Sequence, residues 1–251
     1  MIFYVGLHQP SDARHFARSC ISITRLAKRK KPVQGRLLLD SGAFMELHLF
    51  GGYRHSPAEY AAKVRRLIDN RIADIEIAVA QDFMCEPFML ARTGLTVAEH
   101  QRLTIERYDA LLAECLPVPI MPVLQGYRPA DYVRHLAMYG NRLTQSMWVG
   151  IGSVCKRNGA PEQIVDVLDA VDRERPDLRR HGFGVKETAL LHPGVRALLY
   201  SADSMAWSFA ARRQKRNSND WREAQAFVER IDKTLSIGPR PWQPRLFHDT
   251  V

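Results

Sequence analysis

The chain has 251 residues, of which 46% are hydrophobic and 9% aromatic, with only 15 glycines and 14 prolines. This composition excludes a disordered or fibrous chain, because it supplies enough apolar residues for a sizeable core. The 36 Lys and Arg residues outnumber the 27 Asp and Glu residues and give a formal net charge of +9. Such a charge is compatible with a polyanionic partner, although it also occurs in proteins that bind no nucleic acid.

Short apolar runs alternate with longer amphipathic stretches, and this pattern predicts βα units around a parallel sheet. The predicted strands are Ile2–Val5, Arg36–Leu39, Asp74–Val79, Ile120–Leu124, Met147–Ile151, His181–Val185 and Ala197–Tyr200. The predicted helices are Ser56–Asn70, Thr96–Cys115, Pro129–Tyr139, Pro161–Val171 and Asp220–Leu235. Two of these helices have start signals, because Ser56 precedes a proline, and Thr96 precedes Glu99 by three residues in a capping box.

This alternation predicts a (β/α)8 barrel of the TIM type in a single domain, with one strand that the hydrophobic pattern does not reveal. An open doubly wound sheet is the alternative. No GxGxxG motif follows the first strand, and polar residues stand at the ends of several strands, which favours the barrel. We expect the barrel to span residues 1–237, and we expect residues 238–251, which contain three prolines, to form an extended tail.

The four cysteines lie far apart in the sequence and form no CxxC pair. No metal or disulfide framework is therefore expected. The N-terminal segment lacks the basic leader of a signal peptide, and no stretch reaches the roughly 18 apolar residues of a membrane span. We expect a soluble, cytoplasmic protein with no membrane partner.

Polar residues follow the predicted strands at their carboxyl ends, where a barrel holds its chemistry. Asp40 follows the second strand, Asp82 the third and Asp203 the seventh. Any one of them could cap the next helix, but three together indicate a site. Two carboxylates facing one pocket suit glycosidic chemistry, one as nucleophile and one for proton transfer. Asp82 together with Gln125 suits recognition of the hydrogen-bonding edge of a heterocycle.

Six motifs in a fixed order carry a resemblance to a known superfamily. They are LLLDSGAF (37–44), AQDFMCEPFML (80–90), MPVLQGY (121–127), VGIGSVCKR (149–157), HGFGVK (181–186) and SADSMAWSFAARR (201–213). Over residues 1–213 the sequence resembles the tRNA-guanine transglycosylases, and more closely their phage and bacterial DpdA-like branch, which modifies DNA. The resemblance implies a TIM barrel in which an aspartate displaces guanine, forms a covalent glycosyl-enzyme and then accepts a 7-deazaguanine base.

The resemblance also implies roles for individual residues. Asp203 is the expected nucleophile and Asp40 the expected general acid/base, while His181 is expected to be structural or to support the site. The expected base-binding residues are Ser41, Phe44, Asp82, Gln125, Gly150 and Gly152. Two positions depart from the family pattern: Ala206 stands where the tRNA enzymes carry their nucleophile, and 217–220 stands where relatives carry zinc-binding cysteines. No structural zinc is therefore expected.

The predicted function is exchange of guanine in DNA for a 7-deazaguanine derivative such as preQ0, without a redox or nucleotide cofactor, in a bacterial or phage-infected cell. The alternatives are the same exchange on tRNA, a catalytically silent module that binds nucleic acid or deazapurine, and a nucleosidase. The residues expected to contact the nucleic-acid backbone are Lys156, Arg157, Arg212, Arg213, Lys215 and Arg216. The sequence leaves open a second copy of the chain and helper proteins as further partners.

Overall fold

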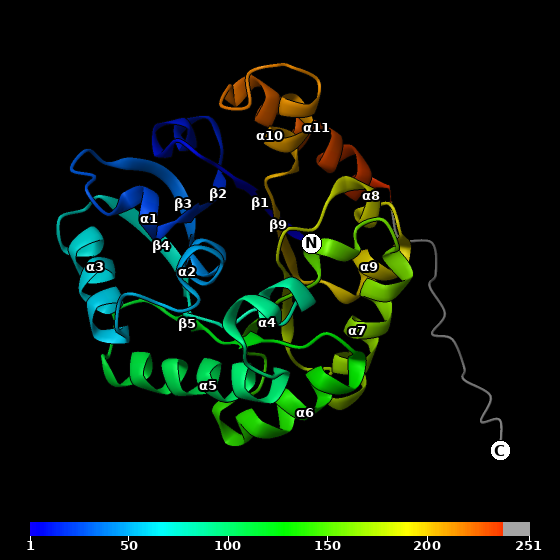
Figure 1. Cartoon of the computed structure of the whole chain (residues 1–251). Helices are drawn as coiled ribbons and strands as arrows, with labels where there is room; N and C mark the ends of the chain where they lie inside the picture. Colours follow the sequence, from blue (N-terminus) through cyan, green and yellow to red (C-terminus); the bar gives the residue numbers. More distant parts are fainter. Residues whose placement is uncertain (238–251) are drawn as a thin grey trace.

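The computed structural model describes residues 1–237, which form a ring of parallel strands surrounded by helices (Figure 1). The strands are β1 (Ile2–Gly6), β2 (Arg18–Ser22), β3 (Val33–Asp40), β4 (Ala73–Val79), β5 (Ile120–Met121), β6 (Val123–Leu124), β7 (Trp148–Ile151), β8 (Arg179–Gly182) and β9 (Ser201–Ser204). Their order in the sheet is β5-β4-β3-β2-β1-β9-β8-β7-β6. The predicted α/β barrel of the TIM type is thereby confirmed.

The ring closes through the segment that contains β5 and β6, which are two halves of one strand interrupted at Pro122. On one side, the Ala80 N–H donates to the Met121 carbonyl (3.0 Å), and on the other side the Gly150 N–H donates to the Pro122 carbonyl (2.8 Å). Counting β5 and β6 as one strand, the barrel has eight strand positions. An open doubly wound sheet has two free edges, so closure rules out that alternative.

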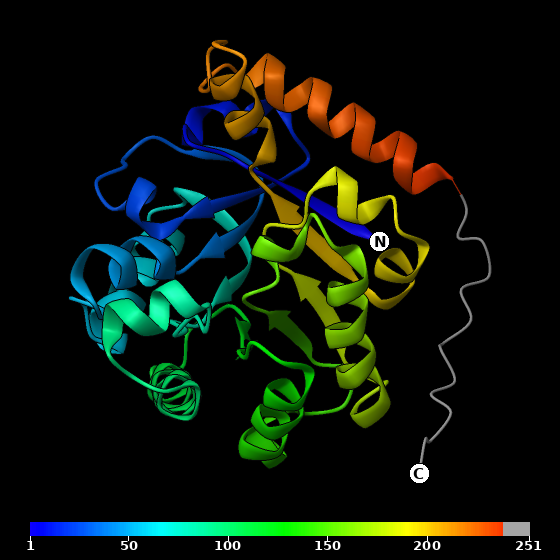
Figure 2. The same cartoon turned by 45° about the vertical axis from the view of Figure 1, so that its right-hand side comes forward.

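The helices lie outside the ring, and each of the five predicted helices is present within a few residues of its expected bounds. The α-helices are α1 (Ile23–Leu26), α2 (Ala43–Phe50), α3 (Pro57–Asp69), α4 (Pro87–Thr93), α5 (Val97–Ala113), α6 (Pro129–Tyr139), α7 (Pro161–Glu174), α8 (Glu187–Leu190), α9 (Pro193–Leu198), α10 (Ala206–Arg213) and α11 (Trp221–Ser236). Short 3-10 helices span Pro10–His15, Gly140–Arg142 and Cys155–Arg157. In Figure 2, α11 runs along the outer surface of the barrel.

One predicted strand was wrong and one strand was hidden from the hydrophobic pattern, and both have the same physical cause. The apolar run Ala197–Tyr200 belongs to the end of α9 and the turn after it, whereas the strand is Ser201–Ser204. The strand that the pattern did not reveal is Arg18–Ser22. Both strands turn polar residues toward the inside of the barrel, so their apolar content is low. The sixth predicted strand also begins earlier than expected, at Arg179 rather than His181.

Capping signals were reliable guides to helix starts. The Ser56 hydroxyl accepts from the Glu59 N–H (3.1 Å), and the Glu59 carboxylate accepts from the Ser56 N–H (2.7 Å), which completes a capping box at α3. Thr96 and Glu99 form the same reciprocal pair at α5. Each box satisfies backbone donors that a helix start leaves without partners.

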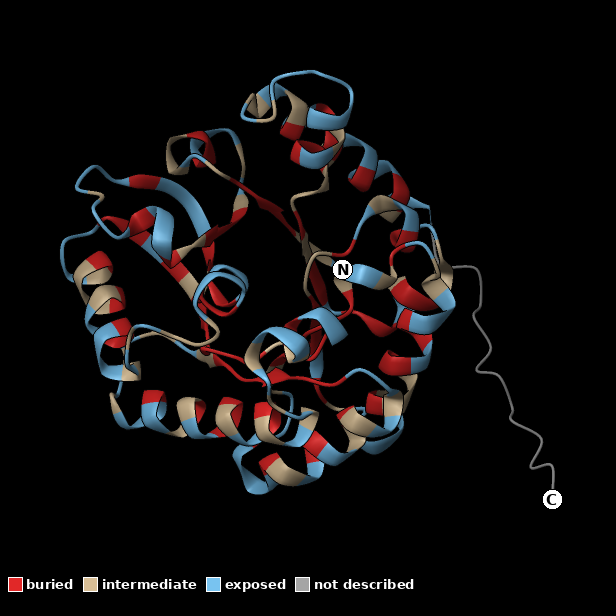
Figure 3. Ribbon diagram, viewed as in Figure 1, coloured by how far each residue is buried: buried red, intermediate tan, exposed pale blue. Residues whose placement is uncertain are grey.

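The interior of the barrel is filled at the amino ends of the strands and polar at the carboxyl ends. A buried cluster inside the ring consists of Tyr4, Cys20, Leu38, Ile77, Val79, Met121 and Val123. The Glu76 carboxylate accepts from the Tyr4 hydroxyl (2.8 Å). Its oxygens also lie 3.7 Å from Arg18 Nε and 3.9 Å from Arg36 Nη1. Figure 3 shows the strands as mostly buried and the outward helix faces as exposed. The packed interior therefore leaves the carboxyl ends as the place to look for a site.

The predicted tail at 238–251 lies outside the described residues, and the boundary at residue 237 stays a prediction. Within residues 1–237, no helix combines the length and the apolar character needed to cross a membrane. All four cysteines are free thiols.

Candidate active site

Asp203 lies on β9 with its side chain facing the inside of the barrel. Its Oδ1 atom accepts from the Gly184 N–H (3.1 Å) and lies 3.3 Å from His181 Nε2. The side chain keeps 13% of its surface exposed. Because Oδ1 takes both contacts, Oδ2 has none of these partners and is the oxygen left for a ligand.

A hydrogen-bond chain from the barrel interior orients His181 toward Asp203. The Trp148 indole N–H donates to Ser201 Oγ (2.8 Å), and Ser201 Oγ lies 2.9 Å from His181 Nδ1. Since an indole can only donate, the serine hydroxyl is free to give its own hydrogen to Nδ1. His181 Nε2 then carries the ring hydrogen and points it at Asp203. The chain therefore holds the Asp203 carboxylate in one orientation.

Asp40 ends β3 at the same mouth and accepts from the Gly42 N–H through Oδ2 (3.0 Å). Gly42 has a φ of 81°, a conformation that side chains disfavour and that brings its N–H to the carboxylate. Burial, together with the negative charge of Asp203, raises the pKa of Asp40 to about 6, against the hydrogen bond from Gly42. This effect indicates that the two carboxylates lie near each other. Burial raises the pKa of Cys20, on β2 between β3 and β9, and the negative charges of Asp203 and Asp40 contribute to that rise.

Asp82 and Gln125 follow β4 and β6, and they contact each other directly. The Gln125 side-chain amide donates to Asp82 Oδ2, and both side chains are buried. Burial, together with the charge of Asp40, raises the pKa of Asp82 to about 7, against the hydrogen bond from Gln125. The two side chains expected to read a base edge are therefore in direct contact, and that role stays a prediction.

Ser153 and Glu86 fix the other end of the Gln125 amide. The Ser153 hydroxyl lies 2.8 Å from Gln125 Oε1 and 3.0 Å from a Glu86 carboxylate oxygen, and it accepts from the Cys85 N–H (2.9 Å). Burial raises the pKa of Glu86. Ser153 has a φ of 56°, a strained backbone conformation for a serine that these contacts stabilise. The amide orientation is thus set by side chains that a ligand need not touch.

Gly152 leaves the space that the Gln125 side chain occupies. A Cβ atom at this position would collide with the side-chain amide of Gln125. Gly150, by contrast, lies under the ring of Phe183, which a Cβ atom would strike. Gly152 therefore lies against the Gln125 side chain and Gly150 against Phe183, and base contact by either glycine stays a prediction.

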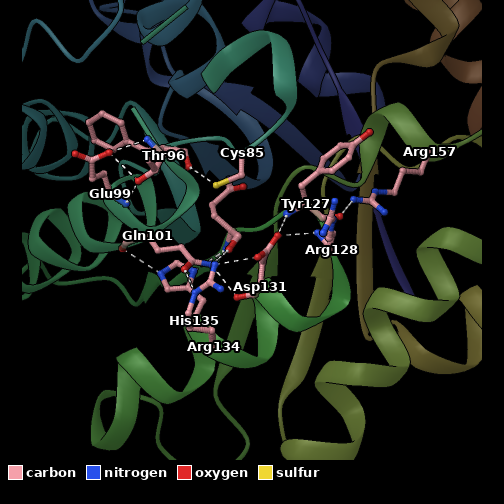
Figure 4. Close-up of polar contacts among 12 residues, drawn as sticks. Cys85, Thr96, Glu99, Gln101, Tyr127, Arg128, Asp131, Arg134, His135 and Arg157 are labelled. Carbon is pink, nitrogen blue, oxygen red and sulfur yellow. Dashed lines mark hydrogen bonds and ion pairs between the residues drawn. The ribbon is translucent and has the colours of Figure 1, made fainter. Parts of the chain in front are cut away.

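The loop that carries Gln125 is held by residues of α5 and α6, among them Gln101, Asp131 and His135, which are labelled in Figure 4. The Gln125 N–H donates to His135 Nδ1 (2.8 Å), and Gln101 donates to the Gln125 carbonyl (2.7 Å). Asp131 accepts from the backbone N–H groups of Tyr127 (3.0 Å) and Arg128 (2.8 Å). Burial lowers the pKa of His135 to about 3, so the imidazole is neutral and Nδ1 keeps accepting at any ordinary pH.

Two of the expected base-binding side chains, Ser41 and Phe44, differ in their surroundings, one being buried and the other exposed. Ser41 is buried with its hydroxyl 3.4 Å from that of Tyr53, which in turn donates to the Asp82 carbonyl (3.0 Å). Phe44 is exposed on α2, where its ring stacks on His48 with 5.4 Å between centroids. Their roles in base binding stay predictions. Because Phe44 is exposed, any base that it contacts would lie at the surface of the protein.

The six basic residues expected to contact a nucleic-acid backbone fall into two groups at the mouth. Lys156 and Arg157 follow β7, and the other four follow β9 at the end of α10 and in the next loop. The guanidinium of Arg157 donates to the Tyr127 carbonyl. Arg216 pairs with Glu223 at the start of α11, so part of its charge is already balanced.

Sequence reasoning assigned His181 no more than a supporting role and missed Ser201, Trp148 and Glu86 altogether. The available signal was alternation, because His181 and Asp203 occupy inward positions of neighbouring strands, and Ser201 pairs with His181 in the sheet register. Reading that signal required the bounds of β8 and β9, which the apolar pattern placed wrongly.

Replacing Asp82 by asparagine is expected to stabilise the protein at pH 8. The folded pKa of about 7 exceeds the ordinary value of 3.8, so burial of the charged carboxylate opposes folding above pH 7, and this cost disappears as the pH falls toward 4. We expect Asp82→Asn to raise the free energy of unfolding by ~1–3 kcal/mol at pH 8 and by much less at pH 4.5, measured by urea denaturation. Asp69→Asn, on the exposed end of α3, is the control. If Asp82→Asn is less stable than the wild type at both pH values, the raised pKa of Asp82 in the folded protein is contradicted.

Comparison with known proteins agrees with this geometry. Within residues 1–237, no group of three or more His, Cys, Asp or Glu side chains is placed to hold a metal ion. A search of curated proteins found no match. The family model for DpdA, deoxypurine in DNA protein A, matches residues 1–220, a range that contains the three carboxylates, Gln125 and Gly152. With most of its length matched by that model, the chain belongs to the DpdA family.

Proposed function

We propose that the protein exchanges guanine in DNA for a 7-deazaguanine base through a covalent bond between Asp203 and the deoxyribose. The observation that carries the proposal is the convergence of two carboxylates, Asp203 and Asp40, beside a buried Asp82–Gln125 pair. Membership of a family named for deoxypurine in DNA supports the choice of DNA over tRNA.

In the first half-reaction, an Asp203 carboxylate oxygen attacks C1′ of the target nucleotide. The new C1′–O bond forms as the glycosidic C1′–N bond breaks, and the electron pair of that bond leaves with guanine, which takes a proton from the carboxylic acid form of Asp40. The hydrogen bonds from His181 and Gly184 hold the attacking carboxylate in place. The product is a glycosyl-enzyme ester and free guanine.

In the second half-reaction, the incoming base gives its ring N–H proton to the Asp40 carboxylate, and its nitrogen attacks C1′. The C1′–O bond to Asp203 breaks and returns the electron pair to the carboxylate. A pKa of about 6 suits Asp40 to both steps, because both protonation states are populated near neutral pH. The two half-reactions together consume no cofactor.

Asp82 and Gln125 supply the recognition of the base. A carboxylate accepts from the ring and exocyclic N–H groups of a guanine edge, while an amide both donates and accepts. Guanine and 7-deazaguanine present the same edge and differ in the five-membered ring, so a single pair of side chains serves the leaving base and the incoming one. Discrimination between them must arise elsewhere in the pocket.

Incubation with radiolabelled preQ0 and either plasmid DNA or tRNA tests the proposal. We expect label in DNA and an equal amount of guanine released. Label in tRNA alone would overturn the choice of substrate. Guanine release without incorporation would indicate a nucleosidase, and binding of DNA without either event would indicate a silent binding module.

A further inference from the structure

Exposed aromatic rings gather at the mouth of the barrel. Among residues 1–237, the exposed phenylalanine and tyrosine side chains are Phe44, Phe50, Phe88, Tyr127, Tyr200 and Phe209. All except Tyr200 lie in segments that follow the carboxyl end of a strand, whereas Tyr200 precedes β9 at the opposite end. This distribution places apolar ring faces in water around the carboxylates, where a soluble protein gains nothing from them unless a ligand covers them.

Three of these rings are each paired with a cation from a loop that follows a different strand. Lys156 Nζ lies 5.4 Å from the centroid of the Phe88 ring, and the Arg157 guanidinium lies 4.7 Å from that of Tyr127. Phe209 has Lys186 at 5.6 Å. We call these three the rim pairs. Figure 4 shows the second of them, with Tyr127 and Arg157 side by side.

A cleft adjoins the third rim pair. Its volume is about 450 Å³, and its lining includes Lys186, Ala206, Phe209, Arg213, Phe227 and Arg230. Ala206 in this lining is the first residue of α10, the helix that follows the strand of Asp203. Arg213 also lies 6.0 Å from the ring of Phe209. The cleft thus combines one exposed aromatic face with positive charges, of which Arg230 is paired with Glu187 at 3.1 Å.

Rings beside cations match the chemistry of an unpaired nucleic-acid strand. Each unpaired nucleotide offers a base face for stacking and a phosphate for a cation, whereas a duplex covers its base faces by internal stacking. We propose, on the basis of the function proposed above, that the rim pairs hold an unpaired stretch of the DNA strand on both sides of the target nucleotide. The cost of extracting the target base from a duplex then falls outside the catalytic step.

The test is direct binding, measured by fluorescence anisotropy with a labelled DNA strand of about 20 nucleotides, alone or annealed to its complement. We expect the wild-type protein to bind the single strand more tightly than the duplex. A triple variant, Phe88→Leu, Tyr127→Leu and Phe209→Leu, should weaken single-strand binding roughly 10- to 100-fold. Its dependence on salt should not change, because the three cations remain.

Matched variants separate stacking from a general loss of structure. Tyr200→Leu removes an exposed ring that has its own cation, Arg179 at 5.3 Å, at the opposite end of the barrel, and it should bind like the wild type. Tryptophan at the three rim positions keeps a ring and should retain tight binding. Equal or tighter binding of the duplex by the wild-type protein, or an unchanged triple variant, would overturn the proposal. Because anisotropy records binding without turnover, a failure of base exchange would leave these results interpretable.

Discussion

Asp203→Asn is expected to abolish base exchange, with a loss of at least about 10³-fold in turnover, because an amide does not attack C1′ as a carboxylate does. The fold should persist. Asparagine keeps an oxygen where Oδ1 accepts from the Gly184 N–H and from His181. The covalent protein–DNA adduct should disappear as well. Denaturing mass spectrometry of protein mixed with DNA in the absence of an incoming base measures the adduct directly.

The Asp40→Asn variant separates proton transfer from formation of the ester bond. Asp40 is expected to move protons rather than to form the ester, so its variant should exchange bases slowly while still forming some adduct. Peptide mapping of the wild-type adduct should place the added mass on the peptide that contains Asp203. An adduct on Asp40, or one that survives Asp203→Asn unchanged, is incompatible with the proposed roles.

Gly152→Ala should remove base recognition without touching any catalytic carboxylate. The new Cβ would occupy the position of the Gln125 side-chain amide and force it away from Asp82 and Ser153. Buried polar groups that lose a partner typically cost ~1–3 kcal/mol each, so we expect base affinity to fall by roughly 10- to 100-fold. Equilibrium binding of preQ0, measured by calorimetry, gives the result.

Gly159→Ala provides the control for that experiment, because a Cβ at position 159 meets no atom within 4 Å. Gly159 follows the same strand as Gly152 and lies seven residues further along. The control should bind preQ0 like the wild type. Normal binding by Gly152→Ala would mean that Gln125 does not read the base.

The sequence was sufficient to locate the carboxylates because their positions depend on strand ends. A polar residue that directly follows a buried apolar run lies at the carboxyl edge of a parallel sheet whatever the details of the fold. Asp40 and Asp82 follow such runs, and the motif around Asp203 marked it independently. Helix starts at Ser56 and Thr96 were equally predictable, since a capping box depends only on residues three positions apart.

The strands that could not be predicted are those whose buried side chains are polar or small. β2 and β9 point Cys20, Ser201 and Asp203 inward, so neither strand has the apolar content that identifies a buried strand. The chain from Trp148 through Ser201 to His181 joins three strands, and its register appears only once the ring is closed. The exposed rings of Phe88 and Phe209 could not be predicted either, because periodicity does not reveal which face a partner covers.

The pairing of β1 with β9 has a consequence for how the protein becomes active. The first and last strands of the barrel are neighbours, with Tyr4 opposite Asp203 in the register. During synthesis, residues 1–204 must therefore all leave the ribosome before Asp203 can dock beside Asp40. A nascent polypeptide that stops before β9 lacks this arrangement, so under the proposed function it cannot form the bond to deoxyribose.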